Sequence, residues 1–150
     1  MSIEENVALV RRNIASAAAE AGRNAGEILL VAATKMNDAG RIQRAIAAGV
    51  DVCGENRVQE MLEKNALGAY RGAPLHFIGH LQKNKVRQVV GLAALIHSVH
   101  SRELLEEISQ IAEKRGIIQD VLLEVNIGGE ASKSGFSPED ILSLIHISEP

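Results

Sequence analysis

Lys35 is the residue whose type and position most clearly suggest chemistry, because it comes at the end of an apolar run, 28–33. An amine at the end of a buried strand is partly desolvated, and desolvation lowers the pKa of a lysine from about 10.4 towards neutrality. A neutral amine can attack an aldehyde carbon and form a Schiff base. The alternative is a lysine on a loop with its side chain in solvent. The position of Lys35 in the sequence, taken alone, favours this alternative.

Polar side chains also follow the later apolar runs of the sequence. In parallel α/β folds the loops after the strands share one face, and ligands bind at that face. The candidate binding residues selected in this way are Asn56, His80, Asn126 and Lys133. Their alternative roles are structural: turn capping by the two asparagines, a loop contact for His80 and a flexible polar loop around Lys133.

Short apolar segments alternate along the chain with amphipathic segments. The apolar segments begin near residues 28, 51, 75, 95 and 119, and this period of roughly 20 to 24 residues predicts parallel βα units. Helices are expected over 3–21, 39–48, 57–67, 82–90 and 101–114, with another helix start at 137–140. The first strand is so apolar that we expect it to be buried on both faces. Five strands cannot close an eight-stranded barrel, which takes about 250 residues, so the sequence fits a small open α/β sheet or a barrel cut short.

The composition excludes several classes of partner. The 150 residues carry 16 basic and 19 acidic side chains, a formal net charge of −3, which gives no electrostatic basis for binding nucleic acid or a membrane surface. Aromatic residues make up 2% of the sequence, so a surface for stacking bases is not expected. No apolar run reaches the roughly 18 residues that span a bilayer. Cys53 is the single cysteine, and we expect a buried thiol and a cytoplasmic location.

Metal binding is not expected. His76 and His80 are four residues apart, but the pattern places them on a strand and its exit, where four residues span about 13 Å. They therefore cannot share a zinc ion.

The end of the sequence is unusual, because residues 143–150 form an atypical tail with no closing element. We expect one domain over 1–150 that is incomplete.

Several segments resemble the pyridoxal phosphate homeostasis protein family, which is related to the N-terminal domain of alanine racemase. They are Leu30–Lys35, Gly54–Glu60, His76–Lys85, and Glu124–Ile127 with Lys133–Gly135. The stretch His76–Gln82 is the most specific, and the match continues in order to about residue 142. The resemblance implies an α/β fold, the N-terminal portion (about five βα units) of a (β/α)8 TIM-type barrel that is truncated at its C-terminus.

The resemblance also implies a cofactor. Lys35 would carry pyridoxal 5′-phosphate (PLP) as a Schiff base at the end of the first strand, with further cofactor contacts from the later loops. Asn56 and Asn126 would bind the pyridine ring or its hydroxyl group, His80 would lie beside the ring or the phosphate, and Lys133 would make a secondary contact. The family's phosphate-binding segments lie on the last strands and are absent here, so we expect weak cofactor binding and exposed apolar edges that favour aggregation.

The role implied by the resemblance is vitamin B6 homeostasis: the protein holds PLP without catalytic turnover. The alternative is a PLP-dependent amino-acid racemase. A racemase needs a second base, a tyrosine from an additional β-domain, whereas the single tyrosine here, Tyr70, falls on a predicted surface loop. The implied partners are PLP and PLP-dependent apo-enzymes, and we expect a monomer.

Overall fold

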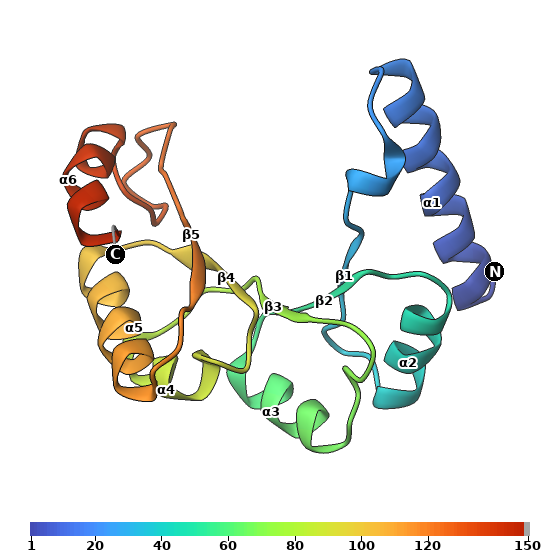
Figure 1. The fold of residues 1–150 in the computed structure, drawn as a ribbon, viewed down its shortest axis with the longest axis horizontal. Helices are drawn as coiled ribbons and strands as arrows, with labels where there is room; N and C mark the ends of the chain where they lie inside the picture. Colours follow the sequence, from blue (N-terminus) through green and yellow to red (C-terminus); the bar gives the residue numbers. More distant parts are fainter. Residues whose placement is uncertain (149–150) are drawn as a thin grey trace. The chain divides into compact units, whose positions relative to one another are not determined.

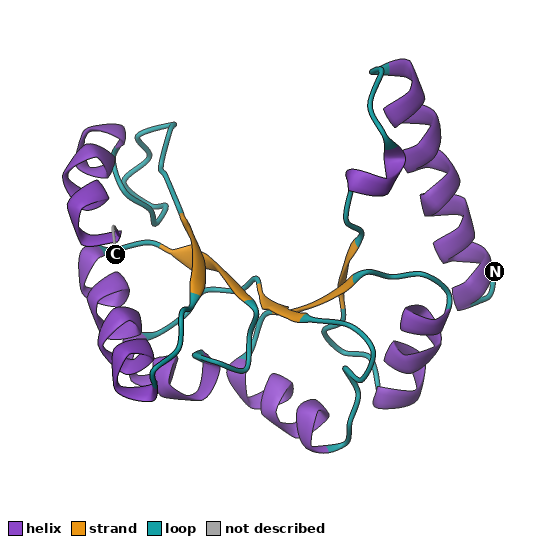
Figure 2. Ribbon diagram, viewed as in Figure 1, coloured by secondary structure: helices purple, strands orange, loops and turns teal. Residues whose placement is uncertain are grey.

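The computed structural model describes residues 1–148, in which five strands alternate with helices along the chain. The chain divides into two compact units, Met1–His76 and Phe77–Pro150. Each strand is followed by a helix in both units (Figures 1 and 2). This alternation confirms the α/β class that the apolar periodicity predicts.

The first unit contains two paired strands. Its elements are α1 (Ile3–Glu20), a 3-10 turn η1 (Ala25–Glu27), β1 (Val31–Ala33), α2 (Ala39–Ala47), β2 (Val52–Glu55) and α3 (Val58–Ala66). The strands β1 and β2 run parallel, with Val31 opposite Val52 and Ala33 opposite Gly54. The register therefore brings the exits of β1 and β2 side by side. The short strand β3 (Leu75–Phe77) spans the boundary between the units.

The second unit has the same alternation. Its elements are a 3-10 turn η2 (Lys83–Lys85), α4 (Val86–Val89), β4 (Leu95–Val99), α5 (Arg102–Arg115), β5 (Asp120–Leu123) and α6 (Pro138–Ser148). The strands β4 and β5 run parallel. Ser101 caps the start of α5 through its side chain, and Gly116 ends the helix in the left-handed conformation (φ 64°). Both signals were readable in the sequence.

Two elements differ from the sequence-based expectation. The helix expected over 82–90 is a 3-10 turn followed by the four-residue α4. The first strand begins at Val31: a 3-10 turn over Ala25–Glu27 precedes it, and the Leu30 N–H donates to the Asp51 side chain instead of to a backbone carbonyl. The expectation that β1 is buried on both faces is also wrong, since Ala33 is exposed.

The tail expected to be atypical, 143–150, continues α6 as far as Ser148, and Glu149 and Pro150 lie outside the described residues. A single domain over 1–150 stays a prediction. Within residues 1–148, no helix combines the length and apolar character that crossing a membrane requires.

Candidate functional site

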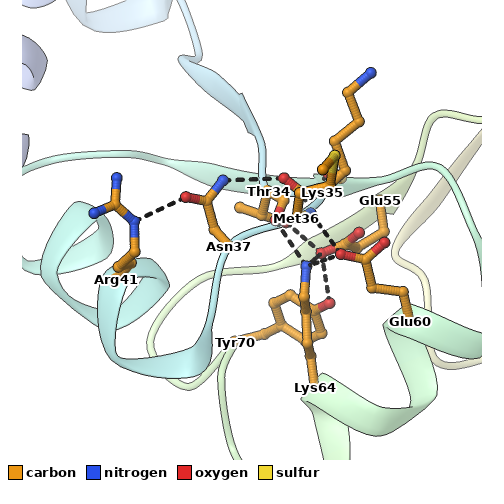
Figure 3. A network of polar contacts seen from close by, with 10 residues as sticks. Thr34, Lys35, Met36, Asn37, Arg41, Glu55, Glu60, Lys64 and Tyr70 are labelled. Atoms are coloured by element: carbon orange, nitrogen blue, oxygen red, sulfur yellow. Dashed lines mark hydrogen bonds and ion pairs between the residues drawn. The ribbon is translucent and has the colours of Figure 1, made fainter.

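Lys35 lies two residues beyond the end of β1, where the chain leaves the sheet. Thr34 still follows the parallel ladder, since its N–H donates to the Gly54 carbonyl at 2.9 Å. The Lys35 side chain is exposed and extends away from the neighbouring polar side chains (Figure 3). Of the two alternatives for Lys35, the structure shows the solvated side chain that position alone favours, and not the desolvated one.

The residue after Lys35 has an unusual backbone. Met36 has a φ of 61° and is the one non-glycine residue with a positive φ in the part of the chain that the structure describes. The left-handed conformation costs a residue with a side chain about 1–2 kcal/mol. The Met36 N–H donates to Glu60 Oε1 at 2.6 Å, and the Lys35 carbonyl accepts from Asn37 Nδ2 at 3.0 Å. The main chain around Lys35 is thus tied down by side-chain contacts.

A buried carboxylate lies at the exit of β2, beside this segment. Glu55 is fully buried, and its Oε1 accepts three hydrogen bonds (Figure 3). The donors are Thr34 Oγ1 at 2.6 Å, Lys64 Nζ at 2.9 Å and Tyr70 Oη at 2.9 Å. We call Thr34, Glu55, Glu60, Lys64 and Tyr70 the strand-exit network.

Lys64 is the centre of the strand-exit network. Its Nζ donates to the Thr34 carbonyl at 2.7 Å and to Glu55, and it forms an ion pair with Glu60 at 2.7 Å. Burial is the largest single influence on its pKa and lowers it, but the hydrogen bonds to Glu60 and Glu55 together raise the pKa above its ordinary value. The Lys64 hydrogen bond, helped by the Met36 N–H, lowers the pKa of Glu60. Both groups are therefore held in their charged forms.

Tyr70 corrects one sequence-based expectation. It was expected on a surface loop, but it is only 6% exposed and its hydroxyl donates to Glu55. Burial, followed by the hydrogen bond to Glu55, raises the pKa of the Tyr70 phenol. Its loop position in the sequence gave no sign of this, because the partner is a strand-end carboxylate 15 residues away.

Asn56 follows Glu55 and shares the exit of β2. Its side chain is partly buried, and its Oδ1 is buried without a hydrogen-bond partner, as is Glu55 Oε2. Buried acceptors are usually satisfied in proteins. An unpaired Oδ1 fits a ligand that brings a donor, such as a ring hydroxyl group. Lys35 and Asn56 come from the exits of paired strands, and this juxtaposition is the one that the sequence predicts.

Cys53 lies within β2 and is fully buried, as expected. Burial raises the pKa of its thiol to about 11, and the nearby Glu55 charge acts in the same direction. The thiol is therefore protonated at neutral pH and has no part in nucleophilic chemistry here.

In the second unit, His80 follows β3 and its side chain is exposed. The His80 ring stacks on the His100 ring, with centroids 4.6 Å apart and an angle of 9° between the planes. His100 Nε2 lies 3.3 Å from the Leu81 carbonyl oxygen, which orients the inner ring of the pair. The outer ring, His80, is accessible from solvent.

Asn126 and Lys133 belong to the loop after β5. Asn126 Nδ2 donates to the carbonyls of Glu130 at 2.8 Å and Lys133 at 3.3 Å, so the amide holds the loop together. The Lys133 ammonium group is exposed and lies 3.3 Å from Glu130 Oε2. This loop lines a cavity of about 440 Å³ that also includes Ser132 and Ser134. The donor half of Asn126 is thus engaged in the loop, which is the structural alternative for this residue.

The structure groups the sequence-predicted residues by unit. Lys35 and Asn56 lie together in the first unit, and Asn126 and Lys133 lie together in the second, which also contains His80.

The sequence analysis missed the strand-exit network. One signal was available: Glu55 comes two residues after the apolar Cys53, just as Lys35 comes two residues after Ala33. Among the described residues, no group of three or more His, Cys, Asp or Glu side chains could hold a metal ion.

Comparison with known proteins identifies the family. The model of the alanine racemase N-terminal domain matches residues 6–149. Three relatives described as pyridoxal phosphate homeostasis proteins are similar to this chain. They come from Aquifex aeolicus (40% identity; 96% of this chain and 63% of the relative), Pseudomonas aeruginosa (38%; 95% and 62%) and Escherichia coli (37%; 95% and 62%).

Two solved structures are also similar to this chain. A crystal structure of an unknown protein from Bifidobacterium adolescentis has a TM-score of 0.86 and 43% identity, over 95% of this chain and 62% of that one. PipY of Synechococcus elongatus with PLP bound has a TM-score of 0.73 and 34% identity, over 89% of this chain and 63% of that one.

The alternation of strands and helices and the family match define an α/β protein, and the N-terminal portion of a (β/α)8 barrel is confirmed as its fold. The chain belongs to the alanine racemase N-terminal domain family, and its resemblance to the pyridoxal phosphate homeostasis proteins is confirmed. The chain spans about 62–63% of the length of these curated relatives.

Proposed function

We propose that this chain binds pyridoxal 5′-phosphate through Lys35 and serves PLP homeostasis without catalytic turnover. The observation that carries the proposal is the combination of a fixed main chain and a free amine at Lys35. Its flanking backbone is held by Lys64, Asn37 and Glu60, while its side chain is exposed. The names of the relatives and the PLP bound to PipY support the choice of cofactor.

The chemistry needs only a free amine and an aldehyde. When bound, PLP would supply the aldehyde that condenses with the Lys35 amine, and the aldehyde oxygen would leave as water. The buried, unpaired Asn56 Oδ1 supports the proposal that this residue accepts a hydrogen bond from the ring hydroxyl. His80, Asn126 and Lys133 remain proposed contacts from the second unit.

The absence of turnover is supported by the state of Tyr70. It is the single tyrosine of the sequence, its hydroxyl is already donated to buried Glu55, and its pKa is raised. It therefore cannot take a proton from a substrate at neutral pH. A PLP-dependent racemase is the alternative, favoured by the family match alone. We further propose that the recipients of the cofactor are PLP-dependent apo-enzymes and that the protein is a monomer.

Borohydride trapping tests the proposal. The chain would be titrated with PLP, followed by absorbance, then reduced, and the modified peptide would be located by mass spectrometry. We expect the label on Lys35, its loss in Lys35→Ala, and its retention in Lys83→Ala, which removes another exposed lysine. Labelling spread evenly over the surface lysines would contradict the proposal, and racemisation of alanine that depends on Lys35 would favour the enzyme.

A further inference from the structure

We infer that Glu60 and Lys64 are positioning residues that fix the backbone from which the Lys35 amine projects; this inference rests on the proposed function. Neither residue touches the amine itself. They bind the main-chain groups on its two sides, the Thr34 carbonyl and the Met36 N–H.

Both contacts come from a single helix. Glu60 and Lys64 lie one turn apart on α3 and form an ion pair at 2.7 Å. Lys64 donates to the peptide group before Lys35 at 2.7 Å, and Glu60 accepts from the peptide group after it at 2.6 Å. The two bonds act as one clamp, because the ion pair links the two side chains that make them.

The backbone needs such a clamp. Met36 has a left-handed conformation that a side-chain-bearing residue adopts at a cost, and strained residues persist where surrounding contacts over-determine them. The Met36 side chain cannot supply those contacts, since it is 92% exposed. The backbone turn is closed by the Asn37 N–H, which donates to the Thr34 carbonyl at 3.2 Å, and the hydrogen bond to Glu60 adds a side-chain contact at Met36 itself.

The clamp is anchored in the buried part of the unit. Lys64 is 8% exposed, and its three N–H donors are matched by Thr34, Glu55 and Glu60. Glu55 is fully buried, so a movement of the Lys64 ammonium group away from it would leave the Glu55 carboxylate buried without its cation. The Lys35 side chain makes none of these contacts and stays free to react.

A clamp of this kind affects reaction rate through geometry. An amine that is displaced by about 1 Å from its reactive position can lose roughly a hundredfold in rate. Removing the Met36 contact should therefore slow the reaction at Lys35 even when the chain remains folded. An ordinary structural contact would change stability without changing the reaction of the folded chain.

The experiment compares three substitutions on α3 in the full chain. Glu60→Ala removes the acceptor for the Met36 N–H, Glu60→Gln keeps an oxygen at that position, and Glu63→Ala is the matched control. Glu63 is exposed on the same helix, and its side-chain carboxylate accepts a hydrogen bond from Gln59 Nε2 at 2.9 Å. The readouts are amide hydrogen exchange at Met36 and the rate of borohydride-trapped labelling of Lys35 by PLP.

We expect Glu60→Ala to lose protection at Met36 and to slow labelling of Lys35 by about tenfold to a hundredfold. Glu60→Gln should recover most of the rate, and Glu63→Ala should behave as wild type. Wild-type labelling in Glu60→Ala, or a Glu60→Gln variant as slow as Glu60→Ala, would overturn the inference. If the wild-type chain itself shows no labelling of Lys35, the proposed function fails, which is a different result.

Discussion

The ammonium group of Lys64 lies 2.9 Å from the carboxylate of Glu55, in an ion pair whose side chains are 10% and 0% exposed. This pair forms beside the segment that carries Lys35 and connects it to the interior of the first unit. Removing one member of a buried pair leaves the other charge uncompensated, which is costly. The strand-exit network is therefore a stability element as well as a positioning device.

Replacing Lys64 by methionine should lower the free energy of unfolding by about 3–5 kcal/mol, because the buried Glu55 carboxylate loses its cation. Urea denaturation followed by circular dichroism measures this change. The double variant Glu55→Leu with Lys64→Met should recover part of the loss, since neither charge is then stranded. A loss below about 1 kcal/mol in the single variant would contradict the assignment of a buried pair.

Replacing Tyr70 by phenylalanine should cost about 1.5–3 kcal/mol, because a hydrogen bond to a charged group is lost while the ring stays in place. The measurement is again urea denaturation, with Glu63→Ala as the surface control. An unchanged midpoint for Tyr70→Phe would show that the phenol does not bond to Glu55 in solution.

Substitutions at Met36 should report its backbone conformation, because the side chain is 92% exposed and packs on little. Valine is strongly disfavoured at positive φ, so Met36→Val should destabilise the chain by about 1 kcal/mol. Asparagine tolerates the left-handed region, so Met36→Asn should be as stable as wild type or more stable. Thermal melts of the three chains test this order, and a valine variant at least as stable as the asparagine variant would refute it.

The stability of the first unit should depend on pH through Glu60. The pKa of Glu60 is lowered from its ordinary value of 4.5, so the stability it contributes is present above pH 4.5 and is lost as the pH falls through its folded value. Unfolding curves at pH 7 and pH 3 should differ less in Glu60→Gln than in wild type. Glu63→Gln should leave the difference unchanged, and an equal difference in Glu60→Gln and wild type would contradict the prediction.

Much of the fold could be predicted from the sequence because its signals are local. Ser2 with Glu5 forms the expected capping box on α1, and the apolar periodicity located every strand. The expected helix over 82–90 failed because short-range propensity does not decide between an α-helix and a 3-10 turn.

The candidate site was only partly predictable. Lys35 and Asn56 were found because both follow apolar strands, but their surroundings depend on contacts between distant residues. Lys64 reaches Thr34 across 30 positions, and no pattern in the sequence distinguishes it from a solvated helix lysine. The burial of Tyr70 was missed for the same reason.

The position of Cys53 inside β2 offers a way to follow the opening of the first unit. Because its thiol is enclosed and stays protonated at neutral pH, alkylating reagents should modify it only when the strand separates from its neighbours. Because the sequence has a single cysteine, the rate of Cys53 alkylation would measure the rate of local unfolding near Lys35 without an added label.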